Sequence, residues 1–390
     1  MIPLSVTSSE EFKVQLCESL SLKYALRNTV KEIVSGVGEL RRISNCGNLS
    51  GQAVPVLSFG IDGNPFFVTD NCESASCPYC ATRLGAERLH DLEDAINSFH
   101  IRFPFGCVAM MVLTFSHRID AALSDIGTRF RDAKQMFFRE CKVKKILRSL
   151  GCIGRVTAPE TTWSNLNGFH PHEHILFFFE SASDSDILSA RQQLFPYWEK
   201  VCCRVGFRTV FDRFYFEKQI SKHLKDYVTK CAREVTLSDC KKGFSASSGV
   251  THYSPFQLVS AFMETKNSVF SEKFTEYALY SKGLKSYNWS KGLAETLSVK
   301  HFSPEFKVKR KEFMKDSINV FFSGNDFPDF QKVKFIAESV GSDQKERFIR
   351  FMMYLSSSAF RDRVKLIQIH GKQFEFSDFL KRIQGREAIL

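Results

Sequence analysis

The chain has 390 residues, of which 43% are hydrophobic and 25% are charged, so it is not a disordered chain and is long enough for two or three folded domains. The formal net charge of +11 at pH 7 favours a polyanionic partner such as nucleic acid, with simple solubility as the alternative. Phe is frequent, at 39 residues, and supplies both core material and stacking surfaces for bases.

Residues 1–20 lack the basic segment and apolar core of a secretory signal. No apolar run reaches the length of a membrane span. We therefore expect a cytoplasmic protein, in which the 12 cysteines serve as reduced thiols or metal ligands rather than as a disulfide framework.

The N-terminal region, residues 1–99, is predicted to contain helix and a zinc-binding module. Cys77-x-x-Cys80 forms a tight knuckle whose two sulfurs can reach one ion. Cys72 is near enough in sequence to be a third ligand, and Cys46, at the head of an expected hairpin, is the natural fourth. A redox pair is the competing interpretation, but the thioredoxin-like strand that precedes such a pair is not seen. The pattern predicts a structural Zn²⁺ site, with unligated cysteines as the alternative.

The middle region, residues 100–295, is predicted to be the catalytic domain. A nearly continuous apolar run at 106–115 indicates a buried central strand, and 121–150 indicates a helix or a pair of helices. Two further strands, at 154–163 and 168–179, are joined by residues typical of a hairpin loop. The expected fold class is α+β, with an antiparallel sheet and flanking helices.

His170, His172 and His174 alternate along the second of these strands, so the three side chains share one face. A symmetric hairpin places Glu160 directly opposite His172, whereas a slip of one residue would turn Glu160 away. A carboxylate beside two imidazoles suits Mn²⁺ or Mg²⁺, and histidines that merely face solvent are the alternative. We expect His170 to face substrate or to support the ligands rather than to bind the ion.

A helical pattern follows at residues 217–234. His223, Tyr227 and Lys230 lie four and three residues apart, so they share one side of this helix. A Tyr beside a Lys can act as a phenolate nucleophile because the cation favours the charged form. A helical Tyr that only packs is the alternative.

Several motifs occur in order along the chain: the cysteine cluster that ends in Cys77-Pro78-x-Cys80, Leu113-Thr114-Phe115, His170-Pro171-His172-x-His174, Tyr227-x-x-Lys230, Ser254-Pro255-Phe256-Gln257-Leu258, and residues 276–293. Together they resemble the HUH-endonuclease replication initiators, and more narrowly the rolling-circle initiator family of small plasmids. The resemblance covers about residues 40–295.

The resemblance implies that His172 and His174 bind the catalytic Mg²⁺ or Mn²⁺ and that Tyr227 is the nucleophile. Tyr227 would attack a phosphodiester in single-stranded or extruded origin DNA, leaving a 5′-phosphotyrosyl link and a free 3′-OH that primes replication. Lys230 would bind the phosphate or lower the pKa of Tyr227. A host helicase is a further partner that the resemblance implies.

The chain departs from the family pattern at three positions. Glu173 stands where an apolar residue is usual, His223 stands where some members carry a Glu that activates water, and Cys231 replaces a second Tyr. A two-tyrosine mechanism is therefore disfavoured. Termination is left to His223 as a base or, in a homodimer, to the Tyr227 of a second copy.

The C-terminal region, residues 296–390, is predicted to be a basic accessory region for origin recognition or oligomerisation. Two other functions stay open at this point. One is a single-Tyr transposase or relaxase that uses the same site, and the other is a non-enzymatic, zinc-containing DNA-binding regulator.

Overall fold

The computed structural model describes residues 22, 25–46, 56–59, 65–67, 72–219, 246–247, 250–285, 287–299, 318–322, 336–337, 344–356, 364–369 and 372–384. The chain divides into two compact units. The larger unit takes residues 25–44 and 73–303, and the smaller takes residues 1–24, 45–72 and 304–390.

The larger unit is built on a five-stranded antiparallel sheet in the order β6-β3-β5-β4-β9. The strands are β3 (Cys107–Leu113), β4 (Cys152–Ser164), β5 (Gly168–Phe179), β6 (Tyr215–Lys218) and β9 (Asn288–Trp289). The centre of the sheet is the β3–β5 pair, where apolar side chains on both faces are buried. The predicted buried strand and the predicted hairpin are both confirmed.

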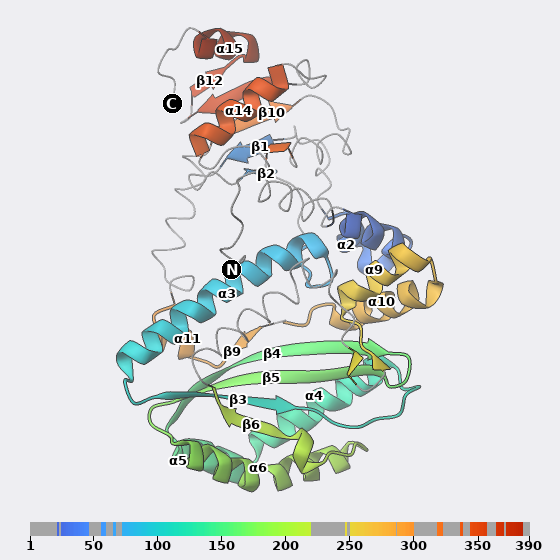
Figure 1. Cartoon of the computed structure of the whole chain (residues 1–390), viewed down its shortest axis with the longest axis vertical. Helices are drawn as coiled ribbons and strands as arrows, with labels where there is room; N and C mark the ends of the chain where they lie inside the picture. Colours follow the sequence, from blue (N-terminus) through green and yellow to red (C-terminus); the bar gives the residue numbers. More distant parts are fainter. Residues whose placement is uncertain are drawn as a thin grey trace. The chain divides into compact units, whose positions relative to one another are not determined.

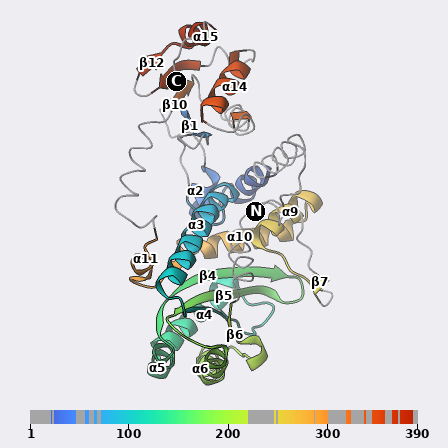
Figure 2. The ribbon, with the colours of Figure 1, turned by 60° about the vertical axis from the view of Figure 1, so that its left-hand side comes forward.

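Helices cover both faces of this sheet (Figures 1 and 2). On one face lie α4 (Leu123–Arg139), α5 (Cys141–Ser149) and α6 (Asp184–Arg204), so the predicted helix pair is also confirmed. Aromatic rings of α4 contact both its neighbours. Phe137 packs edge-on against Trp198 of α6 at 5.6 Å, and Phe138 lies 6.3 Å from Phe177 of β5.

The opposite face packs against α3 (Pro78–Arg102) and α11 (Leu293–Thr296). Leu92 and Phe99 of α3 share one core cluster with Val156, Leu176 and Phe178 of the sheet. This cluster covers only the part of β5 that follows the histidines, because the apolar stretch of the strand begins there.

The larger unit also contains helical residues 25–34, together with η1 (Gly38–Leu40), α2 (Arg41–Ser44), η2 (Phe211–Arg213), β7 (Ala246–Ser247), β8 (Val250–Thr251), α9 (Pro255–Thr265) and α10 (Ser268–Ser281). Helix α9 begins with a capping box between Ser254 and Gln257, which satisfies two backbone donors at its first turn. Glu276 of α10 accepts a hydrogen bond from the backbone N–H of Leu123 at 2.8 Å and so holds the start of α4.

The smaller unit contains a second antiparallel sheet in the order β12-β11-β10-β1-β2. Its strands are β1 (Val56–Phe59), β2 (Pro65–Phe67), β10 (Ile318–Phe322), β11 (Val364–Ile369) and β12 (Lys372–Phe374), and its helices are α14 (Gln344–Ser356) and α15 (Phe376–Gln384). Both helices pack on one apolar core with the sheet. The boundaries predicted at residues 99 and 295 assign β1 and β10 to different regions, whereas the structure pairs these two strands in one sheet.

Within the described residues, no helix combines the length and the apolar character that a membrane crossing requires. Of the helix predicted at 217–234, Glu217 and Lys218 belong instead to strand β6, and residues 220–234 lie outside the described residues.

Candidate metal centres

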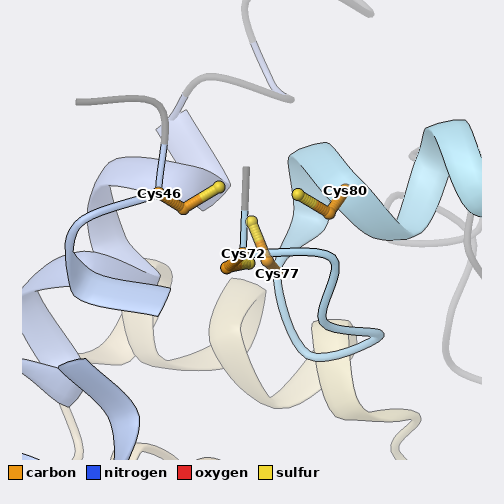
Figure 3. A group of neighbouring side chains, drawn as sticks. All are labelled: Cys46, Cys72, Cys77 and Cys80. Atoms are coloured by element: carbon orange, nitrogen blue, oxygen red, sulfur yellow. The ribbon is translucent and has the colours of Figure 1, made fainter. Parts of the chain in front are cut away.

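Four cysteines form the first candidate metal centre. The sulfurs of Cys46, Cys72, Cys77 and Cys80 all lie within 4.8 Å of one another, and all four residues are buried. Figure 3 shows the side chains converging from two stretches of chain, one that ends at Cys46 and one that runs from Cys72 into α3. The structure therefore brings together the complete set that the sequence predicts.

The start of α3 places two of these ligands. Cys77 is the N-cap, Pro78 occupies the first turn, and the backbone N–H of Ala81 bonds to the Cys77 carbonyl at 2.8 Å, so Cys80 stands one turn along. The positive end of a helix dipole favours thiolates over thiols at these positions. Four buried sulfurs suit Zn²⁺, which binds each thiolate at about 2.3 Å in a tetrahedron. This cluster could hold a structural zinc ion.

The second candidate centre lies on the β4–β5 hairpin. The ladder pairs Glu160 with His172 and Ala158 with His174, which is the predicted register. Ligand atoms of Glu160, His172 and His174 lie within 4.8 Å of one another. One carboxylate oxygen, Oε2 of Glu160, is 3.2 Å from Nε2 of His172 and 2.8 Å from Nε2 of His174.

The charge state of Glu160 fits a cation site. Burial by itself raises the pKa of this carboxyl, but hydrogen bonds and charge from His172 and His174 outweigh burial and hold the pKa well below 4.5. The carboxylate is therefore ionised at neutral pH. Two imidazole nitrogens and one carboxylate oxygen form a donor set that could hold Mn²⁺ or Mg²⁺.

The His172 ring is also oriented by its own strand. Its Nδ1 lies 3.2 Å from the carbonyl oxygen of His170, so an N–H at Nδ1 donates to that carbonyl. Because Nδ1 is held in this way, Nε2 is the nitrogen that would give up its proton, and its hydrogen bond to Glu160, to bind a metal ion.

His170 has a different environment from the other two histidines. Its Nε2 lies 2.8 Å from the hydroxyl of Thr114, and it is not among the three residues whose ligand atoms converge. Burial, followed by the charges of His172, His117 and His252, lowers the pKa of His170 to about 3, so the ring is neutral at pH 7.

Sequence reasoning missed the residue that pairs with Glu173. This side chain points to the face of β5 away from the histidines, is 1% exposed, and meets Lys134 of α4 at 2.7 Å. Strand alternation assigns Glu173 to the far face, and the apolar surroundings show that it needs a cation there. Nothing local in the sequence singles out Lys134, which is 39 residues away.

Tyr227, Lys230 and His223 lie outside the described residues, within 220–245. Their assignment as nucleophile, phosphate-binding cation and base stays a prediction. Comparisons with protein-family models, with curated proteins and with solved structures found no match. The structure therefore defines an α+β protein with an antiparallel sheet, flanking helices and a cysteine cluster that could bind zinc.

Proposed function

We propose that the protein is a rolling-circle replication initiator, which nicks and rejoins single-stranded DNA at an origin in a metal-dependent reaction. The observation that carries the proposal is the convergence of Glu160, His172 and His174 on one face of the β4–β5 hairpin. Tyr227-x-x-Lys230 follows in the sequence, in the order that the resemblance requires. The net charge of +11 supports a polyanionic substrate.

In the proposed reaction the phenol oxygen of Tyr227 attacks the phosphorus of a phosphodiester. A bond forms between this oxygen and phosphorus, the bond from phosphorus to the 3′-oxygen breaks, and the phenol proton ends on the released 3′-OH. Glu160, His172 and His174 would hold the metal ion, which would withdraw charge from the phosphate oxygens. Lys230 stabilises the negative charge of the phosphate, and rejoining reverses the same exchange without external energy.

The test is covalent adduct formation. Purified protein is incubated with Mn²⁺ and single-stranded DNA from its own replicon, and DNA-linked protein is detected on a denaturing gel. We expect an adduct that disappears in Tyr227→Phe and falls at least about tenfold in His174→Asn. Tyr197→Phe, a Tyr of helix α6, is the matched control and retains the adduct. An undiminished adduct in Tyr227→Phe contradicts the proposal.

One alternative has its own observation. The buried cysteine cluster and the positive charge also suit a zinc-containing DNA-binding regulator without enzymatic activity. Such a protein would bind origin DNA and give no adduct under any metal. A transposase or relaxase would give the adduct but would act on transposon ends or transfer origins rather than on a replication origin.

A further inference from the structure

The histidine-bearing face of β5 is closed in one direction along the strand. Beyond His174 the same face continues with Leu176 and Phe178, which are 1% and 0% exposed. Phe99 of α3 meets Phe178 edge-on at 5.2 Å, so helix covers this part of the strand. A polymer bound at Glu160, His172 and His174 cannot continue over this end of the face.

In the other direction the face carries a row of imidazole rings. The rings of His172 and His170 are 5.4 Å apart with 27° between their planes, and those of His170 and His117 are 6.0 Å apart with 21° between them. We call His172, His170 and His117 the imidazole row. It leads from a candidate metal ligand to the loop of residues 114–120.

That loop is held in place from several sides. Ser116 and Arg208 exchange two backbone hydrogen bonds, of 2.7 and 3.3 Å. Next to them Phe115 stacks on Phe207 at 4.0 Å with only 15° between the rings. A surface that is fixed before a ligand arrives loses little conformational entropy on binding.

The hairpin itself also clamps the loop. Gly168, at the start of β5, has a φ of +68°, and a Cβ there would stand 2.4 Å from the carbonyl oxygen of Ile119. Only glycine allows this approach of the two backbones. The loop is therefore fitted against the end of the strand that carries the histidines.

Apolar side chains are exposed where the row ends. Ile119 is 54% exposed, and Leu166 at the hairpin turn is 63% exposed. Arg118, beside Ile119, adds an exposed cation that pairs with Asp120 at 3.0 Å. Unpaired bases stack on surfaces made of flat rings and apolar side chains, with a cation nearby, while their phosphates stay in water. The imidazole row, Ile119 and Arg118 provide such a surface.

We propose that the imidazole row and Ile119 form the path of the single-stranded DNA segment next to the phosphate held at Glu160, His172 and His174. This inference rests on the proposed function and adds the direction in which the substrate leaves the metal centre. His117 and Ile119 contact the bases, while His170, fixed by Thr114 at 2.8 Å, lies between His117 and the candidate metal ligand His172.

The test uses the full chain and a fluorescein-labelled random 15-nucleotide single-stranded DNA in Mn²⁺, with affinity measured by fluorescence anisotropy. His117→Ala removes a stacking ring and Ile119→Ser removes an apolar contact surface, and each is expected to weaken binding about tenfold. Leu188→Ser is the matched control, because Leu188 of α6 is 52% exposed and lies on a different element. Its affinity is expected to equal that of wild type.

A parallel titration with Mn²⁺ alone separates this path from the metal centre. We expect His117→Ala and Ile119→Ser to bind Mn²⁺ as wild type does and to form the covalent adduct with a raised half-saturating DNA concentration. If both variants bind the DNA like wild type, the path is wrong while the proposed function stands. If wild type neither binds the DNA nor forms an adduct, the proposed function and the path fall together.

Discussion

The ammonium group of Lys134 lies 2.7 Å from a carboxylate oxygen of Glu173, the residue between the candidate metal ligands His172 and His174. The pair lies on the far side of the sheet, where Lys134 is 25% and Glu173 1% exposed. The pair connects helix α4 to strand β5 at Glu173, and the side chains of His172 and His174 project from the opposite face of the same strand. A buried ion pair of this kind stabilises only while both partners are present.

Lys134→Met is therefore expected to lower the free energy of unfolding of the larger unit by about 3 kcal/mol, since it leaves a buried carboxylate without its cation. Urea denaturation followed by tryptophan fluorescence measures this unit alone, because Trp163, Trp198 and Trp289 all belong to it. The double variant Lys134→Met with Glu173→Leu should recover most of the loss. A double variant no more stable than Lys134→Met would show that the ion pair is not the cause.

Removal of one thiolate should empty the cysteine cluster. Wild-type protein is expected to carry about one Zn²⁺ per chain, and Cys77→Ser much less, because a four-coordinate site with three thiolates binds zinc more weakly. Elemental analysis of the purified proteins measures the content. Cys203→Ser, at an exposed cysteine outside the cluster, is the control and keeps its zinc. Equal zinc content in wild type and Cys77→Ser would contradict the assignment.

Removing the charge of Glu160 in the second candidate centre should weaken Mn²⁺ binding without affecting zinc in the cysteine cluster. Glu160→Gln keeps the shape of the side chain but removes the charge that lies 2.8 and 3.2 Å from the two imidazoles. Affinity for Mn²⁺, followed by the loss of the free-ion EPR signal, is expected to fall at least about tenfold. Glu180→Gln, at an exposed residue beyond the end of β5, should bind as wild type. The zinc content of both variants should stay unchanged.

Adjacent cysteines should differ sharply in reactivity. Burial raises the pKa of Cys202 to about 12, whereas Cys203 is exposed. The thiolate is the reactive form, so at pH 8 iodoacetamide should label Cys203 and spare Cys202, as read by peptide mass spectrometry. Because the folded-state pKa lies above the ordinary value of 9.0, protonated Cys202 stabilises the fold below pH 9. That contribution is lost as the pH rises from 9 towards 12, and Cys202→Ala should lack this pH dependence.

Much of the hairpin that carries Glu160, His172 and His174 could be predicted from sequence because its signals are local. Alternation puts His172 and His174 on one face, and a short connector of turn residues fixes the register that brings Glu160 across. The Cys77-x-x-Cys80 knuckle is equally local, since a helix start sets its geometry.

The contacts that could not be predicted from sequence are those between segments that lie far apart in the chain. Lys134 reaches Glu173 only because α4 packs across the sheet, and His117 meets His170 only because Ile119 sits against Gly168. The sheet that pairs β1 with β10 is the extreme case, since no periodicity in either segment identifies its partner.

Because β1 pairs with β10, the sheet of the smaller unit cannot form until late in synthesis of the chain. Residues 56–67 leave the ribosome early, but their partner strand at 318–322 follows only some 250 residues later. At ribosomal speeds the delay is on the order of tens of seconds. During this time Leu57 and Phe59, which end fully buried, have only β2 beside them and lack the rest of their sheet and core. Nearly all of the larger unit, up to residue 303, is synthesised in the interval, so the early segment of the smaller unit is the part of the nascent chain that waits longest for its partner and is most exposed to aggregation and to chaperones.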